Sequence, residues 1–262
     1  MQAENDKCPI EICDGSGIIT YEDNTYSECN CRKAMHVQNY VAKALIPSAY
    51  KNKMFDDFDP EHKGQEEIIV KLREYVDQWE ERREDGYGVT LMSKETRVGK
   101  SHLACAVAHA LIEKHQKSIE EDLVVFVNVT NWIDRWRAFY ARFNPDSEMD
   151  TIDLGERQKE IDALCALDSR MNNCGLLILD DIGEVPCTQF VSSKLYSVVE
   201  YRTSNNRPIL ITSNHSWREM QGKYGDDGVR ITDRLEEKSN CYTFKFDKPL
   251  QKRKVKTKKS NK

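Results

Sequence analysis

The sequence predicts an α/β protein: a domain with a mainly parallel sheet flanked by helices, plus a small cysteine-rich N-terminal module. Apolar, β-prone segments alternate with helical segments between residues 88 and 214, as in parallel sheets covered by helices. A loop of the phosphate-binding type follows the first of these strands. Four cysteines within the first 31 residues predict the separate module. A length of 262 residues accommodates both parts.

The individual elements follow from apolar periodicity. Before the alternating region, residues 34–45 suit a short helix that ends at Pro47, and residues 65–84 carry an apolar stripe at helical spacing. The predicted strands are residues 88–92, 123–128, 174–181 and 207–214, and the predicted helices between them are residues 100–115, about 131–171 with a break near Asn144-Pro145, and 188–203. The third strand is wholly apolar over Leu176–Leu179, which indicates burial on both faces.

Composition suggests four segments along the chain. They are a cysteine-rich module (1–45), a linker (46–64), the α/β domain (65–247) and a basic tail (248–262). Residues 251–262 hold seven Lys or Arg and no acid, so we expect the tail to be disordered. Contact with phosphate backbones and simple solubilisation are both compatible with such a tail.

No membrane partner is expected. No segment approaches the roughly 18–20 apolar residues that cross a bilayer, and residues 1–7 lack the apolar core of a signal peptide. We therefore expect a cytoplasmic protein. The nine cysteines do not form a secreted disulfide framework, and the five outside the N-terminal cluster are expected to be buried thiols.

The phosphate-binding loop leads into Gly99-Lys100-Ser101. Backbone N–H groups of such a loop surround the phosphates of ATP, Lys100 reaches the β and γ positions, and the hydroxyl of Ser101 binds Mg²⁺. The pattern G-x-x-x-x-G-K-[ST] asks for glycine at position 94, where this chain has Lys94. The residues expected to bind ATP are Val98, Gly99, Lys100, Ser101 and His102.

The third strand ends in a pair of acids, which is the form of a Walker B element. We expect Asp180 to hold Mg²⁺ through water, and Asp181 to orient or deprotonate the water that attacks ATP. The alternative is a strand that ends in two solvated acids. Asn214 follows the fourth strand and is expected beside Asp180, where it can hold the attacking water or the γ-phosphate. Taken alone, Asn214 is more simply interpreted as an ordinary turn residue.

The N-terminal cysteines form two close pairs, Cys8-x4-Cys13 and Cys29-x-Cys31. Four thiolates from two turns suit the tetrahedral coordination of Zn²⁺, and four free thiols are the alternative. His36 is a possible substitute ligand or an ordinary helix residue. Because about 33 residues bury little apolar surface, zinc would supply most of the stability of this module.

The segment 132–143 mixes aromatic residues with arginines. Both types suit single-stranded DNA, but the aromatic residues also match the stripe of a buried helix face. We therefore expect most of the rings to pack in the core. The candidate DNA contacts are Arg135, Arg137 and Arg142.

The motifs together resemble the AAA+ helicase loaders of the DnaC/DnaI type. The resemblance covers nearly the whole chain, from Cys-x-Cys-Arg-Lys and Ala-Leu-Ile-Pro-Ser-Ala-Tyr through Gly-Lys-Ser-His-Leu-Ala and Leu-Leu-Ile-Leu-Asp-Asp-Ile-Gly to Gly-Val-Arg-Ile-Thr-Asp-Arg-Leu. The chain also resembles the ATPase partners of some transposases, which usually lack the cysteine module.

The resemblance implies an ATP-dependent loader of the replicative DNA helicase. Its N-terminal region is expected to dock on the helicase, and a helical element after the second strand is expected to face single-stranded DNA. Asn214 corresponds to the sensor-1 position. Arg230 or Arg234, with Arg230 favoured, is expected to act as an arginine finger on a neighbouring subunit. Without the resemblance, two surface arginines paired with Asp226, Asp227 or Glu237 are the simpler interpretation.

The altered loop leaves the ATPase activity open. Loaders of this type normally carry glycine where this chain has Lys94 and Arg97. A non-glycine residue at positive φ costs on the order of 1 kcal/mol. The two cations either face the phosphates, or fill the cradle and leave a weak or inactive ATPase. A non-hydrolysing helicase-binding adaptor and a transposase-partner ATPase remain alternatives.

Overall fold

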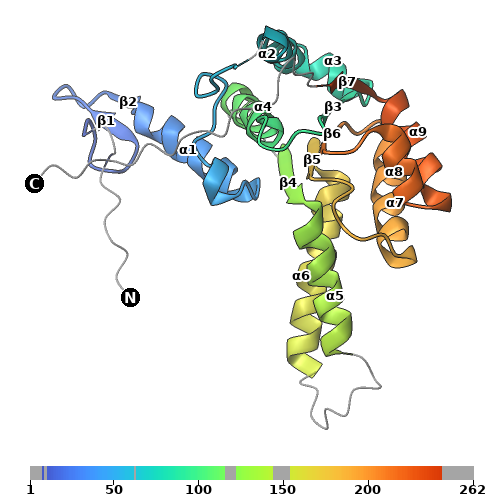
Figure 1. Ribbon diagram of the computed structural model, residues 1–262. Helices are drawn as coiled ribbons and strands as arrows, with labels where there is room; N and C mark the ends of the chain where they lie inside the picture. The colour runs from blue at the N-terminus through green and yellow to red at the C-terminus, as the bar shows by residue number, and fades with distance from the viewer. Residues whose placement is uncertain (1–7, 9–10, 62, 116–121, 144–153, 244–262) are drawn as a thin grey trace, which may run out of the picture.

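The computed structural model describes residues 8, 11–61, 63–115, 122–143 and 154–243, without the side chains of residues 33–36, 63 and 240–243. Figure 1 shows a cysteine-rich module, an α/β domain and a pair of helices that project from it. The basic tail and the expected break near Asn144-Pro145 lie outside the described residues.

The central sheet has five strands in the order β4-β5-β6-β3-β7, and every adjacent pair is parallel. The strands are β3 (Gly88–Met92), β4 (Val124–Asn128), β5 (Leu176–Asp180), β6 (Ile209–Ser213) and β7 (Ser239–Thr243). The α/β class with a mainly parallel sheet is therefore confirmed. Because all five strands run the same way, their carboxyl ends meet at one edge, which is where the P-loop and the acid pair lie.

Helices cover both faces of the sheet. They are α2 (Lys63–Asp77), α3 (Trp79–Glu84), α4 (Lys100–His115), α5 (Val129–Arg142), α6 (Leu154–Asn173), α7 (Gln189–Ser204), α8 (Trp217–Lys223) and α9 (Asp226–Glu237). One apolar core joins the sheet to α5–α9, and a second joins it to α2 and α4. In the described part of the chain, no helix is both long and apolar enough to cross a membrane.

Several boundaries differ from the sequence-based expectation. The helix expected over residues 65–84 divides into α2 and α3 at Gln78, whose backbone is not helical. The short helix expected at residues 34–45 begins earlier, at Asn30. Strand β7 and helices α8 and α9 were not predicted. Helix α8 is short and β7 has mixed polarity, whereas α9 has a helical stripe of buried residues, among them Ile231 and Leu235, that the prediction missed.

The N-terminal module contains an antiparallel hairpin of β1 (Ile18–Thr20) and β2 (Tyr26–Glu28), followed by α1 (Asn30–Lys43). Helix α1 leads to the α/β domain (Figure 1), where the carbonyl of Ala44 accepts a hydrogen bond from the backbone N–H of Phe126 at 2.7 Å. The expected linker therefore begins at the edge of the sheet. It contains a 3₁₀ turn, η1 (Ser48–Tyr50), and it buries Phe55.

Helices α5 and α6 project from the domain as a pair (Figure 1). The expected core packing of the aromatic stripe is confirmed: the buried rings are Trp132, Trp136, Phe139 and Phe143. Tyr140 is the exception, with 52% of its surface exposed. The indole N–H groups of Trp132 and Trp136 both donate to Asp168 on α6, at 2.8 and 3.3 Å, which fixes the two helices to each other.

A buried cation anchors the start of β5. Arg202 on α7 is fully buried and donates to a ring of backbone carbonyls. These belong to Met171, Asn172, Cys174, Gly175 and Pro208. The last carbonyls of α6 lack partners within the helix and carry the negative end of its dipole, so the guanidinium satisfies both needs. This contact holds the strand that carries the acid pair.

Candidate active site

The P-loop joins β3 to α4 and closes around Lys100. The ammonium group of Lys100 is buried and donates to the carbonyls of Ser93 at 3.3 Å and Glu95 at 3.0 Å. Burial lowers the pKa of Lys100, while the charges of Asp181 and Asp180 act in the opposite direction. The lysine is therefore already inside the loop, close to the two acids.

The backbone φ angles of the loop show which of the two glycine replacements, Lys94 or Arg97, introduces strain. Arg97 has a φ of 63° and Gly99 a φ of 95°, whereas Lys94 is not in the left-handed region. Only Arg97 therefore carries the conformational cost expected for a replaced glycine. The side chain of Lys94 does not point into the loop: its ammonium group lies 2.9 Å from Glu219 on α8. Neither expectation for Lys94, a phosphate contact or a blocked cradle, matches this placement.

The acid pair lies at the carboxyl end of β5. Asp180 is buried and accepts a hydrogen bond from the hydroxyl of Thr212 at 2.8 Å. Asp181 has a φ of 58°, and the side-chain amide of Asn128 on β4 lies 3.5 Å from its carboxylate. Burial, with the nearby charges of Asp180 and Glu184, raises the pKa of Asp181 to about 6. A carboxylate with this pKa is suited to accept a proton near neutral pH.

Asn214 lies just past β6, but its contact differs from the expected one. Its side-chain amide donates to Glu184 at 2.9 Å. The hydrogen bond to Asp180 comes instead from Thr212, two residues earlier. Asn128 and Glu184 were not singled out in the sequence. The position of Asn128 at a strand end was the available signal, whereas the role of Glu184 depends on the fold.

The linker segment contacts the helix that follows the P-loop. The imidazole of His102 donates through Nε2 to the carbonyl of Met54 at 2.9 Å, and its ring meets the ring of Phe58 edge-on at 5.1 Å. Phe58 also lies against Gly99, where an added Cβ would come within 2.1 Å of the ring. His102 is thus held by the linker, beside the expected phosphate cradle.

Two further contacts complete this side of the loop. The side chain of Gln65 on α2 donates to the carbonyl of Val98 at 3.2 Å. Tyr50 interacts through its hydroxyl with Ser101, and burial is the main cause that raises the pKa of Tyr50. The expected ATP-binding residues are therefore brought together on one loop, and the linker packs against them.

The two arginines of α9 differ in their contacts. Arg234 forms an ion pair with Glu200 of α7, with its Nε 3.0 Å from the carboxylate. Arg230 is exposed and has no ion pair with any residue in the part of the chain that the structure describes. The simpler interpretation, which paired these arginines with Asp226, Asp227 or Glu237, is wrong for Arg234.

The arginines of α5 also differ. Arg137 lies 3.4 Å from Asp134 and donates to the carbonyl of Pro186 at 3.2 Å. Arg142 pairs with Glu156 at 2.8 Å. Arg135 is exposed, and no ion pair joins it to another described residue. Of the three predicted DNA contacts, Arg135 is therefore the one whose guanidinium has no ion pair among the described residues.

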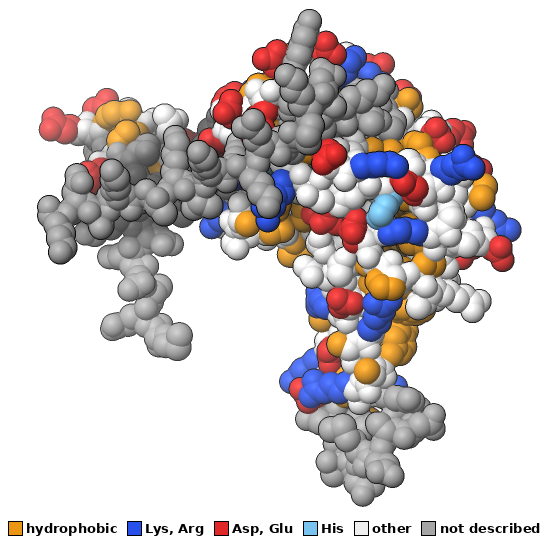
Figure 2. Space-filling model, viewed as in Figure 1, with side chains coloured by type: hydrophobic (Ala, Val, Ile, Leu, Met, Phe, Trp, Pro, Cys, Tyr) orange, Lys and Arg blue, Asp and Glu red, His pale blue; other side chains and the backbone are white. Residues whose placement is uncertain are grey.

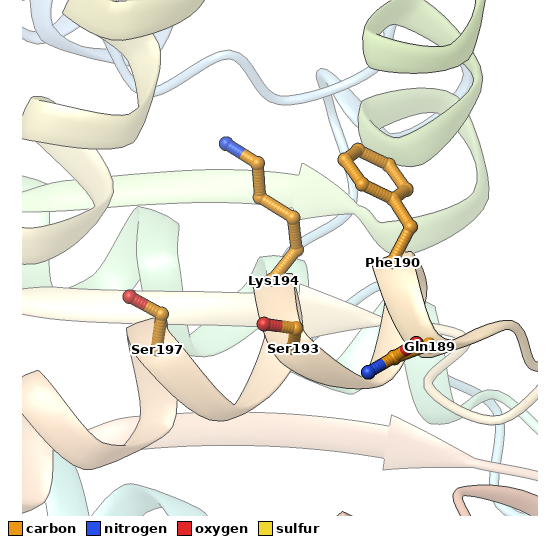
Figure 3. Close-up of a pocket in the computed structure, with 5 residues that line it drawn as sticks. All are labelled: Gln189, Phe190, Ser193, Lys194 and Ser197. Carbon is orange, nitrogen blue, oxygen red and sulfur yellow. The ribbon is translucent and has the colours of Figure 1, made fainter.

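A hollow of about 550 Å³ lies beside α7 rather than at the P-loop (Figure 3). It is lined by Gln189, Phe190, Ser193, Lys194 and Ser197. The ammonium group of Lys194 pairs with Asp168 at 3.0 Å and lies 3.5 Å from the ring centre of Trp136. Because its charge is already compensated, this hollow lacks the free cations of a phosphate site.

The four N-terminal cysteines converge on one point. Their Sγ atoms all lie within 4.8 Å of one another, with Cys8 3.9 Å from Cys29 and Cys13 3.4 Å from Cys31. Tetrahedral zinc with Zn–S bonds of about 2.3 Å places its sulfurs about 3.8 Å apart. The donor set and the spacing therefore fit Zn²⁺. The side chain of His36 lies outside the described residues.

The five remaining cysteines were expected to be buried thiols, and this expectation is only partly correct. Cys105 and Cys174 are buried, whereas Cys165 and Cys187 are exposed. The side chain of Cys241 lies outside the described residues.

The fold is an α/β domain with a P-loop at the carboxyl edge of a parallel sheet, an arrangement suited to binding phosphates. No protein-family model matches the chain. Among curated proteins, the replicative helicase loader DnaC of Buchnera aphidicola subsp. Schizaphis graminum (strain Sg) is 23% identical over 216 residues, which cover 82% of this chain and 76% of the relative.

Solved structures support the same relationship. A crystal structure of the DnaC helicase loader matches with a TM-score of 0.57 at 21% identity, and covers 76% of this chain and 100% of that chain. A crystal structure of DnaI matches with a TM-score of 0.54 at 18% identity, and covers 76% of this chain and 94% of that one. Sequence and fold thus confirm the resemblance to AAA+ helicase loaders of the DnaC/DnaI type.

Proposed function

We propose that this chain is an ATP-dependent loader of the replicative DNA helicase onto single-stranded DNA. The main support is that the buried Lys100 and the acids Asp180 and Asp181 lie at one edge of the sheet. In addition, a curated relative of the chain is a helicase loader. The arrangement supports binding of ATP, with Lys100 at the β- and γ-phosphates and the N-terminus of α4 directed at them.

The residues also fit a divalent cation. The charges of Asp180, Asp181 and Glu184 all act on Lys100, and the pKa of Asp181 is raised by burial and by the other two acids. A bound Mg²⁺ would offset this negative charge and polarise the phosphates. Ser101 and Asp180 are the residues that would hold it. In this site Asp181 orients the attacking water and accepts its proton, and Asn214 holds that water.

An arginine finger would complete the site from a neighbouring subunit. Arg234 is engaged by Glu200 within its own chain, while Arg230 is exposed on the same helix. This difference supports Arg230 as the finger. Self-association of the chain follows from this assignment, because the finger acts on the nucleotide of another subunit.

The N-terminal module would hold the helicase, with Cys8, Cys13, Cys29 and Cys31 binding Zn²⁺. Zinc would fix the hairpin against the start of α1, because Cys31 lies on that helix and Cys29 immediately precedes it. The segment boundaries 1–45, 46–64, 65–247 and 248–262 and the cytoplasmic location stay predictions.

Single-stranded DNA would contact the α5/α6 projection. Figure 2 shows Lys and Arg side chains gathered toward its far end, where Arg142 closes α5 and Arg157 and Lys159 lie in the first turns of α6. Arg142 is partly neutralised by Glu156, so Arg135 and Arg157 are the stronger candidates. The aromatic residues contribute mainly to packing, apart from the exposed Tyr140.

Co-purification with the hexameric replicative helicase tests this proposal. Tagged protein should retain the helicase encoded by the same genome, and a Cys29→Ser variant should lose it. Retention of a transposase instead of the helicase would favour the transposase-partner alternative. Helicase retention by a protein whose ATP turnover equals that of Lys100→Ala would favour the non-hydrolysing adaptor, for which the altered loop is the supporting observation.

A further inference from the structure

Glu184 lies three residues after the acid pair and contacts the sensor position directly. Its Oε1 accepts a hydrogen bond from Nδ2 of Asn214 at 2.9 Å. A carboxylate can only accept, so this contact also fixes which end of the Asn214 amide faces Glu184. The amide plane of Asn214 is thereby held in one orientation.

The segment that carries Glu184 is itself fixed by α8. The ammonium group of Lys223 donates to the carbonyl of Gly183 at 2.6 Å and lies 2.8 Å from Nε2 of His215. Gly183 has a φ of 97°, and an added Cβ would lie 2.7 Å from the imidazole of His215. Lys223 therefore contacts both Gly183, which precedes Glu184, and His215, which follows Asn214.

The charge of Glu184 also reaches the reacting groups. It contributes to the raised pKa of Asp181, after burial and the charge of Asp180, and it acts on Lys100. The same imidazole nitrogen of His215 lies 3.3 Å from the Glu184 carboxylate. Glu184 therefore joins the two strand ends, β5 and β6, that carry the acid pair and the sensor.

We propose that Glu184 is a positioning residue for ATP hydrolysis, which fixes the side-chain amide of Asn214 so that its remaining polar groups hold the attacking water. This inference rests on the proposed ATPase function. It assigns Glu184 an effect that passes through Asn214, without contact between Glu184 and the nucleotide. It therefore concerns the rate of the chemical step and leaves ATP binding nearly unchanged.

Steady-state ATP turnover of the full chain tests the proposal. Glu184→Ala should lower kcat about tenfold or more and change KM less than about threefold. Glu184→Gln should recover most of the rate, because its amide oxygen still accepts from Asn214. The double variant Glu184→Ala/Asn214→Ala should match Asn214→Ala alone, since both changes remove the same positioned group. Glu81→Ala, an exposed acid on α3, is the matched control and should retain the wild-type kcat.

The outcomes separate this inference from the ATPase proposal. Wild-type turnover equal to that of Lys100→Ala contradicts both. If wild-type turnover exceeds that of Lys100→Ala while Glu184→Ala keeps the wild-type kcat, only the inference fails. A loss in Glu184→Ala that adds fully to the loss in Asn214→Ala also overturns it. Should Glu184→Ala not fold, a low kcat in the folded Glu184→Gln variant contradicts the proposal, and a wild-type kcat supports it.

Discussion

The ammonium group of Lys94 lies 2.9 Å from the carboxylate of Glu219, so the phosphate-binding loop is joined to α8. Glu219 also accepts hydrogen bonds from Ser216, from its backbone N–H at 2.8 Å and its hydroxyl at 2.7 Å, which caps α8. These contacts lower the pKa of Glu219 to about 2. The hydrogen bonds from Ser216 are the larger cause, and the contact with Lys94 is the smaller one. The replacement of the loop glycine by Lys94 therefore leaves the cradle clear of its side chain.

Lys94→Ala should change the affinity for ATP less than about threefold, because the lysine contacts Glu219 rather than the cradle. Titration with a fluorescent ATP analogue measures this, and Lys100→Ala serves as the control that loses binding. A tenfold gain in affinity for Lys94→Ala would show that the side chain obstructs the phosphates.

Arg97→Gly should stabilise the protein by about 0.5–1 kcal/mol, because glycine adopts the φ of 63° with little strain, and only part of that gain is offset by its more flexible unfolded chain. Urea unfolding monitored by circular dichroism gives the difference in free energy. Arg97→Ala removes the same charge but keeps a Cβ, so it should show no such gain. Equal stabilisation by both variants would point to charge rather than backbone strain.

Asp181→Asn should raise the stability of the protein at neutral pH. Burial and neighbouring acids raise the pKa of Asp181 from 3.8 in the unfolded chain to about 6 in the fold, so the folded state favours the protonated form. The favourable contribution of protonated Asp181 to the free energy of folding is complete below pH 3.8 and is lost as the pH rises through about 6. The melting temperature of Asp181→Asn should therefore exceed that of wild type at pH 7.5 and approach it at pH 4. A difference independent of pH would contradict the assignment.

The same shift predicts the pH dependence of turnover. A protonated Asp181 cannot accept a proton from the attacking water, so kcat/KM, which reports the free protein, should fall as the pH drops through about 6. Measurement of kcat/KM between pH 5 and pH 8 tests this. An unchanged kcat/KM down to pH 5 would exclude Asp181 as the base.

The purified protein should contain one zinc ion per chain, measured by elemental analysis, because four thiols lie within 4.8 Å of one another. Cys29→Ser should lose the metal and the hairpin fold, while the α/β domain keeps its melting transition. Cys165→Ser, at an exposed cysteine outside the cluster, should keep full zinc. Four titratable thiols at the cluster in fresh protein without metal would contradict the zinc assignment.

Much of the fold follows from the sequence because its buried strands are distinctive. Leu176–Leu179 can only be buried, and the acids after it mark the carboxyl edge of the sheet. In contrast, β7 is a short strand of mixed polarity over residues 239–243, whose pairing with β3 depends on the finished sheet. The early start of α1 was missed because Cys29 and Cys31 were interpreted only as ligands.

The site shows a similar division. Lys100, Asp180 and Asp181 follow from motif and strand context, and the structure brings them together. The contact of Asn214 with Glu184 depends on how the segments after β5 and β6 meet, which no local pattern encodes. The same holds for the ion pair of Lys94 with Glu219, which joins residues 125 positions apart (219 − 94).

Helicase loading tests the central claim most directly. The cognate replicative helicase is mixed with a single-stranded circular DNA annealed to a labelled strand, and strand release is measured with and without this protein. The account predicts that the wild-type protein with MgATP accelerates strand release, and that Lys100→Ala and Cys29→Ser do not. Equal strand release in the presence and absence of wild-type protein, under conditions where the two proteins co-purify, would contradict it.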